Sequence, residues 1–302
     1  IDEKGRVALG IVTGLALIGI SEYAHRNYPM WAQPVSGAAI GVLYVSIVAA
    51  YGLYDLISPI LALLFLCLVV IVGVLTAIRR ESLVMAIISM IAAFLTPVLM
   101  AVSSGVDHLD ENMLVPMIVY VLLIDVGILS VSIFRRWRWF ILVGMLLSYL
   151  MISFLLDDLT FYDSDNRYIL SAIGIASVFL IFGAAGILFH LVWRRVPGPQ
   201  DLTLMILNAA AAYLLTVQAF WENYQDWFGV ITLLASLLYG LVGYGAIARR
   251  SASPQVAIYS LAIAVIFLTV AIPLQLTGAW VTVAWAAEGA VLIWAGLLLG
   301  QL

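Results

Sequence analysis

The 302-residue chain has few of the residues from which soluble enzymes build sites and surfaces. Charged residues make up only 10% of it, against roughly a quarter in soluble domains. There is one cysteine, Cys67, and the three histidines, His25, His108 and His190, lie far apart. A single cysteine excludes an intrachain disulfide framework or a thiolate metal site. Phosphate loops, dinucleotide fingerprints and nucleic-acid patches are missing as well. We therefore expect no resident metal, no cofactor and no nucleic-acid partner.

Hydrophobic residues are abundant instead, at 65% of the chain, and the mean hydropathy is +1.15. They form runs of about twenty residues, the length that crosses a hydrocarbon core about 30 Å thick. A chain segment in lipid must satisfy its own backbone hydrogen bonds, so such spans are helices. The sequence predicts an all-α, polytopic transmembrane helical bundle, with residues 1–302 as a single domain. Eleven spans are expected, at about 6–21, 33–53, 56–78, 82–102, 113–134, 137–156, 168–193, 202–220, 227–248, 254–274 and 279–300.

Basic residues divide unequally between the two ends of these spans. The loops after the odd-numbered spans, up to the ninth, hold ten of the 13 lysines and arginines. Because Lys and Arg in short loops mark the cytoplasmic face, the N-terminus is predicted outside and the C-terminus in the cytoplasm. Pairs of arginines recur at 79, 135, 194 and 249. A duplicated two-helix unit would explain this repeat, but tight hairpins under the positive-inside rule explain it more simply.

The ends of the chain carry a separate expectation. It begins at Ile1 rather than Met, shows no signal-peptide pattern, and stops at Leu302 within an apolar segment. We expect it to be a portion of a longer chain.

Two acids lie near the middle of spans, Asp125 and Glu288. A charged acid at the bilayer centre costs about 2.5–3.5 kcal/mol on the most lenient scale. No Lys or Arg is embedded to neutralise either one, so desolvation favours their protonated forms. Their predicted depths differ by only about 4–5 Å, at 1.5 Å per helical residue, and they could share one cavity. Asn208 or a tyrosine is the expected polar partner of the acids, and Trp285 is interpreted either as a cavity wall or as a packing residue.

Two interpretations of these acids stay open. One is a proton- or cation-coupled site at the midplane. The other is that each neutral acid hydrogen-bonds a neighbouring helix, which contributes about 0.6–2 kcal/mol. Beside Glu288, the small residues Ala286, Gly289 and Ala290 predict that another helix approaches closely.

Aromatic and basic residues suggest contacts at the membrane boundary. Tyr44, Tyr51 and Tyr54 are interpreted as an aromatic belt in preference to a platform for a sugar or lipid headgroup. On the inner face, the arginines of RRWRW, residues 135–139, suit anionic lipid headgroups, although simple topological anchoring also accounts for them. These candidate headgroup contacts are Arg135, Arg136 and Arg138.

Three stretches carry a family resemblance: GVLYVSIVAAYGLYDLISP (41–59), RRWRWF (135–140) and AWAAEGAVLIWAG (284–296). Together they resemble the bacterial predicted membrane protein family known as domain of unknown function 2339, across nearly the whole chain. The helix with Glu288 and Gly289 is the most specific part. Members are typically longer, and the resemblance implies a multi-pass protein of the bacterial inner membrane without implying an activity.

Three function classes remain, and an enzyme is the least favoured. The first is a transporter-like protein for a lipid-linked or small amphiphilic substrate, with Asp125 and Glu288 as proton-responsive groups. The second is a non-catalytic structural or assembly subunit of a larger membrane complex, with other membrane subunits as partners. The third is a transferase acting on a lipid-linked sugar, with outer acids such as Asp157 and Asp158 beside its groove. Membrane lipids are expected partners in every case.

Overall fold

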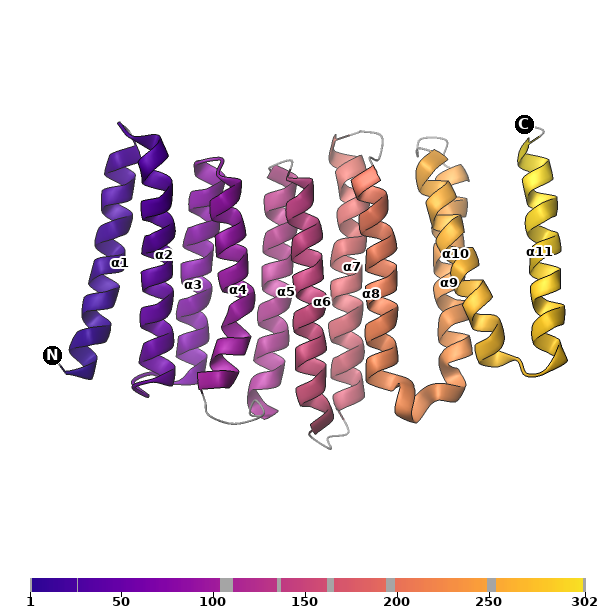
Figure 1. Cartoon of the computed structure of the whole chain (residues 1–302), viewed down its shortest axis with the longest axis horizontal. Helices are drawn as coiled ribbons and strands as arrows, with labels where there is room; N and C mark the ends of the chain where they lie inside the picture. The colour runs from indigo at the N-terminus through magenta and orange to yellow at the C-terminus, as the bar shows by residue number, and fades with distance from the viewer. Residues whose placement is uncertain are drawn as a thin grey trace. The chain divides into compact units, whose positions relative to one another are not determined.

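The computed structural model describes residues 2–25, 27–103, 111–134, 137–161, 166–193, 199–248 and 254–300. These residues form eleven α-helices and one short 3₁₀ turn, η1 (Figure 1). The helices are α1 Glu3–His25, α2 Pro29–Gly52, α3 Pro59–Arg79, α4 Leu83–Ser103, α5 Glu111–Phe134, α6 Arg138–Phe161, α7 Arg167–Trp193, α8 Pro199–Tyr224, α9 Phe228–Ala248, α10 Pro254–Gln275 and α11 Ala279–Gly300, with η1 at Gln225–Trp227.

Each helix covers one of the expected spans to within a few residues, so the chain is an all-α, polytopic membrane protein. Nine stretches of the described residues are long and apolar enough to cross a membrane. One of them, Pro199–Ala248, contains both α8 and α9, while the described apolar part of α11, Ala279–Trp294, is shorter. The number of crossings and the orientation stay predictions.

Prolines and left-handed residues mark several helix ends. α2, α3, α8 and α10 each begin at a proline, which lacks an N–H and has its backbone angle already set for a first turn. Asp55 follows α2 with φ 48° and Glu81 follows α3 with φ 54°. A left-handed residue turns the chain away from the helix axis and lets the following N–H bond back. Accordingly, the Leu56 N–H donates to the Ala50 carbonyl at 2.8 Å.

The chain divides into two compact units, Ile1–Ala185 and Gly186–Leu302. In the first, antiparallel hairpins follow one another: α1 with α2, α3 with α4, and α5 with α6. α2 also contacts α4, α4 contacts α6, and α3 contacts α5. The hairpins are therefore stacked so that α2, α4 and α6 form one row of helices and α3 and α5 form another. Large buried side chains such as Leu66, Met117 and Met145 fill the space between them.

Small residues set how closely α1 approaches α2. A Cβ on Gly10 would lie 2.2 Å from Ser46 Oγ, and one on Gly14 would lie 2.5 Å from Leu43 Cγ. Neither position has room for a side chain, so the two glycines allow the helices to touch.

The second unit centres on the α9–α10 hairpin, against which α8 and α11 pack through α10. The Phe267 ring of α10 packs between Tyr213 of α8 and Tyr239 of α9, with ring centroids at 5.4 and 6.0 Å. The Ser236 hydroxyl of α9 donates to the Ala264 carbonyl of α10 at 2.7 Å. The sequence predicts that residues 1–302 form a single domain, and this stays a prediction.

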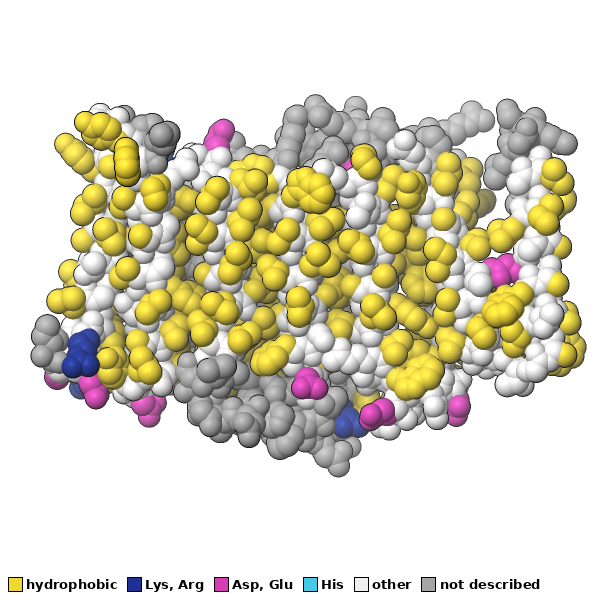
Figure 2. All heavy atoms as spheres, viewed as in Figure 1, with side chains coloured by type: hydrophobic (Ala, Val, Ile, Leu, Met, Phe, Trp, Pro, Cys, Tyr) yellow, Lys and Arg dark blue, Asp and Glu magenta, His cyan; other side chains and the backbone are white. Residues whose placement is uncertain are grey.

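Many large apolar side chains of the described helices are exposed. Figure 2 shows them along the length of the first unit's helices, with the charged side chains at the helix ends. This distribution fits a lipid-facing surface between two aqueous boundaries.

Candidate functional site

Asp125 lies near the middle of α5 and is fully buried. Its Oδ1 accepts a hydrogen bond from the Ser148 hydroxyl of α6, while its Oδ2 has no hydrogen-bond partner. Among the described residues, ion pairs join Glu22 to Arg79 and Arg80, and Asp125 takes part in none. Burying an acid at this depth with an oxygen that has no partner costs free energy. Acids in such positions of membrane proteins are commonly functional.

A glycine in α6 brings Ser148 within reach of Asp125. A Cβ on Gly144 would lie 2.8 Å from Ile128 Cδ1 and 3.0 Å from its Cγ2. Because Gly144 has no side chain, the α6 backbone comes close to α5 one turn before Ser148. The Ser148 hydroxyl also lies 2.8 Å from the Gly144 carbonyl oxygen.

The Ser148 hydroxyl lies between two hydrogen-bond acceptors. Ser148 has one hydroxyl proton, and both the Gly144 carbonyl and Asp125 Oδ1 lie within hydrogen-bond distance of its Oγ. With a proton on Oδ1, Asp125 can donate to Ser148 Oγ while Ser148 donates to the carbonyl, and only Oδ2 is then left without a partner. The geometry around Oδ1 therefore suits a neutral aspartic acid.

Glu288 has the same kind of partner in the second unit. Its Oε1 accepts from the Thr269 hydroxyl of α10 at 2.7 Å, and that hydroxyl also lies 2.9 Å from the Val265 carbonyl oxygen. Trp285 donates its indole N–H to the Thr269 carbonyl at 3.2 Å. Trp285 and Glu288 together attach α11 to α10. Unlike Asp125, Glu288 is only half-buried.

The small residues beside Glu288 are open. Ala286 and Ala290 are exposed, and no heavy atom lies within 4 Å of a Cβ built on Gly289. The close approach of another helix that these residues predicted does not occur within the described part of the unit. Trp285 and Glu288 make the hydrogen-bonded contact with α10 instead.

The other candidate residues are placed unequally. Asn208 is buried in α8. Arg135 and Arg136 lie outside the described residues, and Arg138 begins α6 with its side chain not described. Of the outer acids, Asp157 is exposed, and the Asp158 side chain lies outside the described part. Asp125 and Glu288 belong to different units, so their pairing stays a prediction.

Two polar clusters were missed by sequence reasoning, and the first corrects the interpretation of Tyr44. This tyrosine is buried, and its hydroxyl lies 2.7 Å from that of Thr96 in α4. Tyr120 of α5 donates to Thr96 Oγ1 at 3.0 Å. Tyr44 therefore joins three helices and is not part of a boundary belt. The sequence grouped Tyr44 with Tyr51 and Tyr54 by their spacing alone. Spacing does not show which face of a helix is covered by other helices.

The second cluster surrounds Arg80, which follows α3. Its guanidinium donates to Ser21 Oγ, Ser36 Oγ and the Ala32 carbonyl at 2.8–3.1 Å, and pairs with Glu22 at 2.9 Å. These bonds tie the ends of α1, α2 and α3 together. The sequence indicated the arginine pair as a topology or repeat signal, and Ser21-Glu22 at the end of the first span was the available hint of a polar cluster.

The family model described as "Predicted membrane protein (DUF2339)" matches residues 3–302. The chain belongs to this family. The match agrees with the resemblance carried by the 41–59, 135–140 and 284–296 stretches, and it identifies a membrane protein of unknown function. No curated protein and no solved structure matches the chain. Within the described residues, no group of three or more His, Cys, Asp or Glu could hold a metal ion.

Proposed function

We propose that this membrane protein moves a lipid-linked or small amphiphilic substrate across the bacterial inner membrane, with Asp125 and Glu288 as proton-responsive groups. The observation that carries the proposal is the arrangement shared by the two acids. In each, a hydroxyl on a neighbouring helix lies between the carboxyl group and a backbone carbonyl one turn earlier. In each arrangement one hydroxyl proton lies within reach of two acceptors, the carboxyl oxygen and the carbonyl.

Proton loss would change helix contacts at both acids. At Asp125, a charged carboxylate in a fully buried position would require a new donor or water. At Glu288, the half-buried position leaves the acid accessible from outside the α10–α11 contact. A buried and an accessible acid with the same chemistry provide two steps at which proton binding can be coupled to movement.

The test uses the purified chain in proteoliposomes with a fluorescent short-chain phosphatidylglycerol as the amphiphilic probe. Under an imposed pH gradient, we expect the probe to move between leaflets at least tenfold faster than in protein-free vesicles. Asp125→Asn should abolish the acceleration, because asparagine keeps the size but cannot exchange a proton. Protection of the probe from a membrane-impermeant quencher measures the movement.

Ser132→Ala is the matched control, because Ser132 is also buried in α5 and its hydroxyl donates to a carbonyl of its own helix, that of Ile128, at 2.7 Å. It should keep the wild-type rate. If Asp125→Asn is folded and moves the probe as fast as the wild type, the proposal is contradicted.

A second candidate function is favoured by α11. The exposed Ala286 and Ala290 and the open Gly289 give the small-residue flank that an assembly subunit would offer to a partner helix. In that case the reconstituted chain would move no probe with or without the gradient, and α11 would be protected from labelling only when the partner is present.

A further inference from the structure

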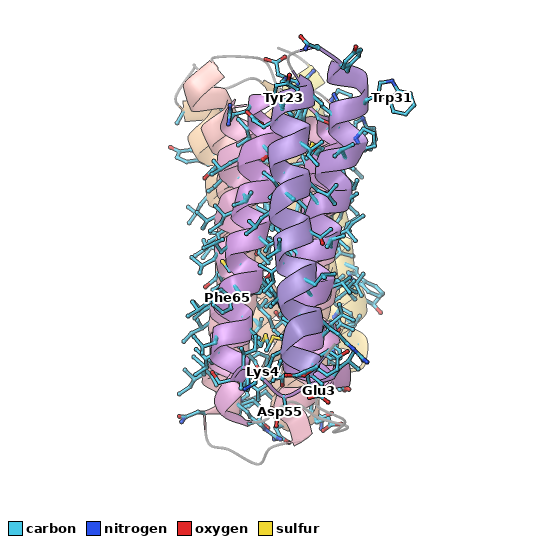
Figure 3. All side chains as sticks on the ribbon, turned by 90° about the vertical axis from the view of Figure 1, so that its left-hand side faces the viewer. Glu3, Lys4, Tyr23, Trp31, Asp55 and Phe65 are labelled. Carbon is cyan, nitrogen blue, oxygen red and sulfur yellow. The ribbon has the colours of Figure 1, made fainter. Side chains whose placement is uncertain are left out.

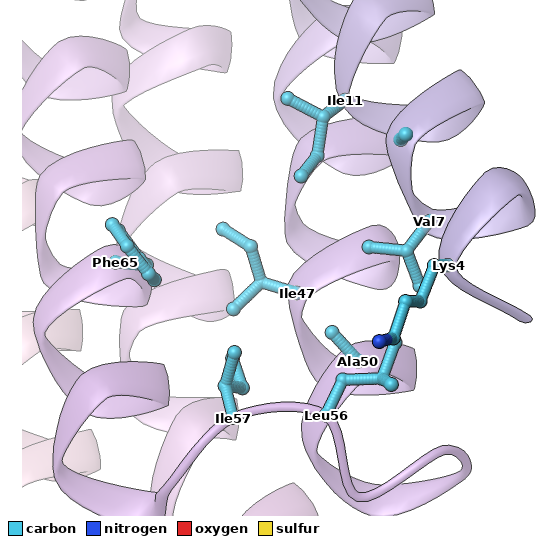
Figure 4. Close-up of a pocket in the computed structure, with 9 residues that line it drawn as sticks. Lys4, Val7, Ile11, Ile47, Ala50, Leu56, Ile57 and Phe65 are labelled. Carbon is cyan, nitrogen blue, oxygen red and sulfur yellow. The ribbon is translucent and has the colours of Figure 1, made fainter.

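An apolar cleft of about 250 Å³ lies at one end of the first unit, beside α1, α2 and α3 (Figure 4). It exists because α1 is held against α2 at Gly10 and Gly14, while the chain folds back after Asp55 and brings Leu56 and Ile57 beneath it. The volume is slightly below the roughly 300–1,000 Å³ of pockets for drug-sized molecules. It suits part of a single hydrocarbon chain.

The cleft deepens from an exposed mouth to a buried floor. Ala8 and Phe65 are exposed, Val7 and Ile11 are half-buried, and Ile47 is 7% exposed. Eight of the nine lining residues are apolar. A chain inserted from the surrounding lipid would therefore meet hydrocarbon along its whole length.

Lys4 is the ninth lining residue and supplies the only charge in the lining. Its side chain reaches from α1 and its amino group points toward the end of α2 (Figure 4). Within residues 2–25 and 27–103, no ion pair or hydrogen bond of this amino group is described. Arg6, one half-turn further along α1, interacts instead with the Tyr54 side chain through a hydrogen bond.

Charge at this end of the unit is mixed. Figure 3 shows Glu3, Lys4 and Asp55 at the same end of the helices. The two acids offset the lysine, so the end is not a basic patch that would require a net anionic lipid. One ammonium group above an apolar cleft matches one phosphate group above an acyl chain.

We propose that this cleft binds a phospholipid of the surrounding leaflet, with an acyl chain along Ile11, Ile47 and Phe65 and its phosphate against Lys4. The site is separate from Asp125 and Glu288 and does not depend on the transport proposal. Phosphatidylethanolamine is a suitable occupant, because it has no net charge and Glu3 and Asp55 lie at the same end of the helices as Lys4.

Native mass spectrometry of the delipidated, detergent-purified chain tests the proposal by titration with dioleoyl-phosphatidylethanolamine or dioleoylglycerol, which has the same chains without phosphate. We expect the phospholipid to bind at least fivefold more tightly. Lys4→Gln should remove this preference, while Arg6→Gln, which loses an equal charge two residues away, should keep it.

A second pair of variants tests the cleft itself. Ala8→Trp places a large ring at the mouth and should reduce phospholipid binding at least fivefold, whereas Leu9→Trp adds a ring on the neighbouring exposed position and should not. Equal binding of dioleoylglycerol, equal effects of the two charge variants, or full binding by Ala8→Trp would each overturn the proposal.

Discussion

At the scale of single residues, two hydroxyl groups and one glycine set the hydrogen-bonding geometry of the acids. Ser148 and Thr269 each stand between a carboxyl group and a carbonyl, and Gly144 brings the first pair within reach. The sequence indicated the two acids because charge is rare in an apolar span. It could not indicate their partners, because serine, threonine and glycine are common in membrane helices.

Gly144→Ala should destabilise the protein by about 1–3 kcal/mol, the usual cost of an overpacked contact, because its Cβ would lie 2.8 Å from Ile128 Cδ1. Adding Ile128→Val removes that Cδ1 atom and should recover part of the loss, so the two changes will not be additive. Thermal unfolding in detergent measures the effect.

Gly127→Ala provides the comparison, because nothing lies within 4 Å of a Cβ built there. It should leave the unfolding temperature unchanged or raise it. A loss at Gly127 as large as that at Gly144 would show that helix packing at Gly144 is not the cause.

At the scale of helices, the sequence predicted most of what the structure contains. Runs of about twenty apolar residues, divided by proline and arginine, placed every helix to within a few residues. The faces of those helices were harder to predict. In lipid, the side toward the protein and the side toward the membrane are both apolar, so Tyr44 could not be assigned to the interior. Which of two neighbouring arginines is buried was equally unreadable.

Arg79 and Arg80 illustrate this limit and give a prediction. Both pair with Glu22, but the Arg80 side chain is 4% exposed and that of Arg79 is 74% exposed. Arg80→Met should destabilise the first unit by on the order of 2 kcal/mol, since hydrogen bonds to charged groups contribute about 1.5–3 kcal/mol. Arg79→Met should cost about 0–1 kcal/mol, as for exposed pairs.

Chemical unfolding of the two variants in the same detergent makes the comparison direct, because each loses one arginine and one contact to Glu22. If the two lost stability equally, the polar cluster around Ser21 and Ser36 would not hold the three helix ends together.

At the scale of the whole molecule, the chain is a multi-pass membrane protein whose helices pack mainly with neighbours in the sequence. Composition was sufficient to establish that class. Sequence reasoning could not establish which residues far apart in the chain meet, because periodicity describes single helices and not the contacts between them. The pairing of Asp125 with Glu288, which lie in different units, stays a prediction.

Orientation is testable at this scale. In a Cys67→Ser background, a cysteine replacing Asp55 should react with a membrane-impermeant maleimide in intact cells. One replacing Glu81 should react only after the membrane is opened, because arginine-rich ends are predicted to be cytoplasmic. Labelling of the Glu81 variant in intact cells, with the Asp55 variant protected, would reverse the predicted topology.

The stacked hairpins of the first unit also bear on how the protein is made. α1 and α2 contact each other before α3 is needed, and α3 and α4 then complete a pair that packs on α2. Within the described residues of this unit, each of these early helices contacts a helix that lies next to it or two places further along the chain. Each helix pair can therefore pack as soon as both of its helices have been inserted into the membrane. The first unit can in this way fold during synthesis, from its first hairpin onward.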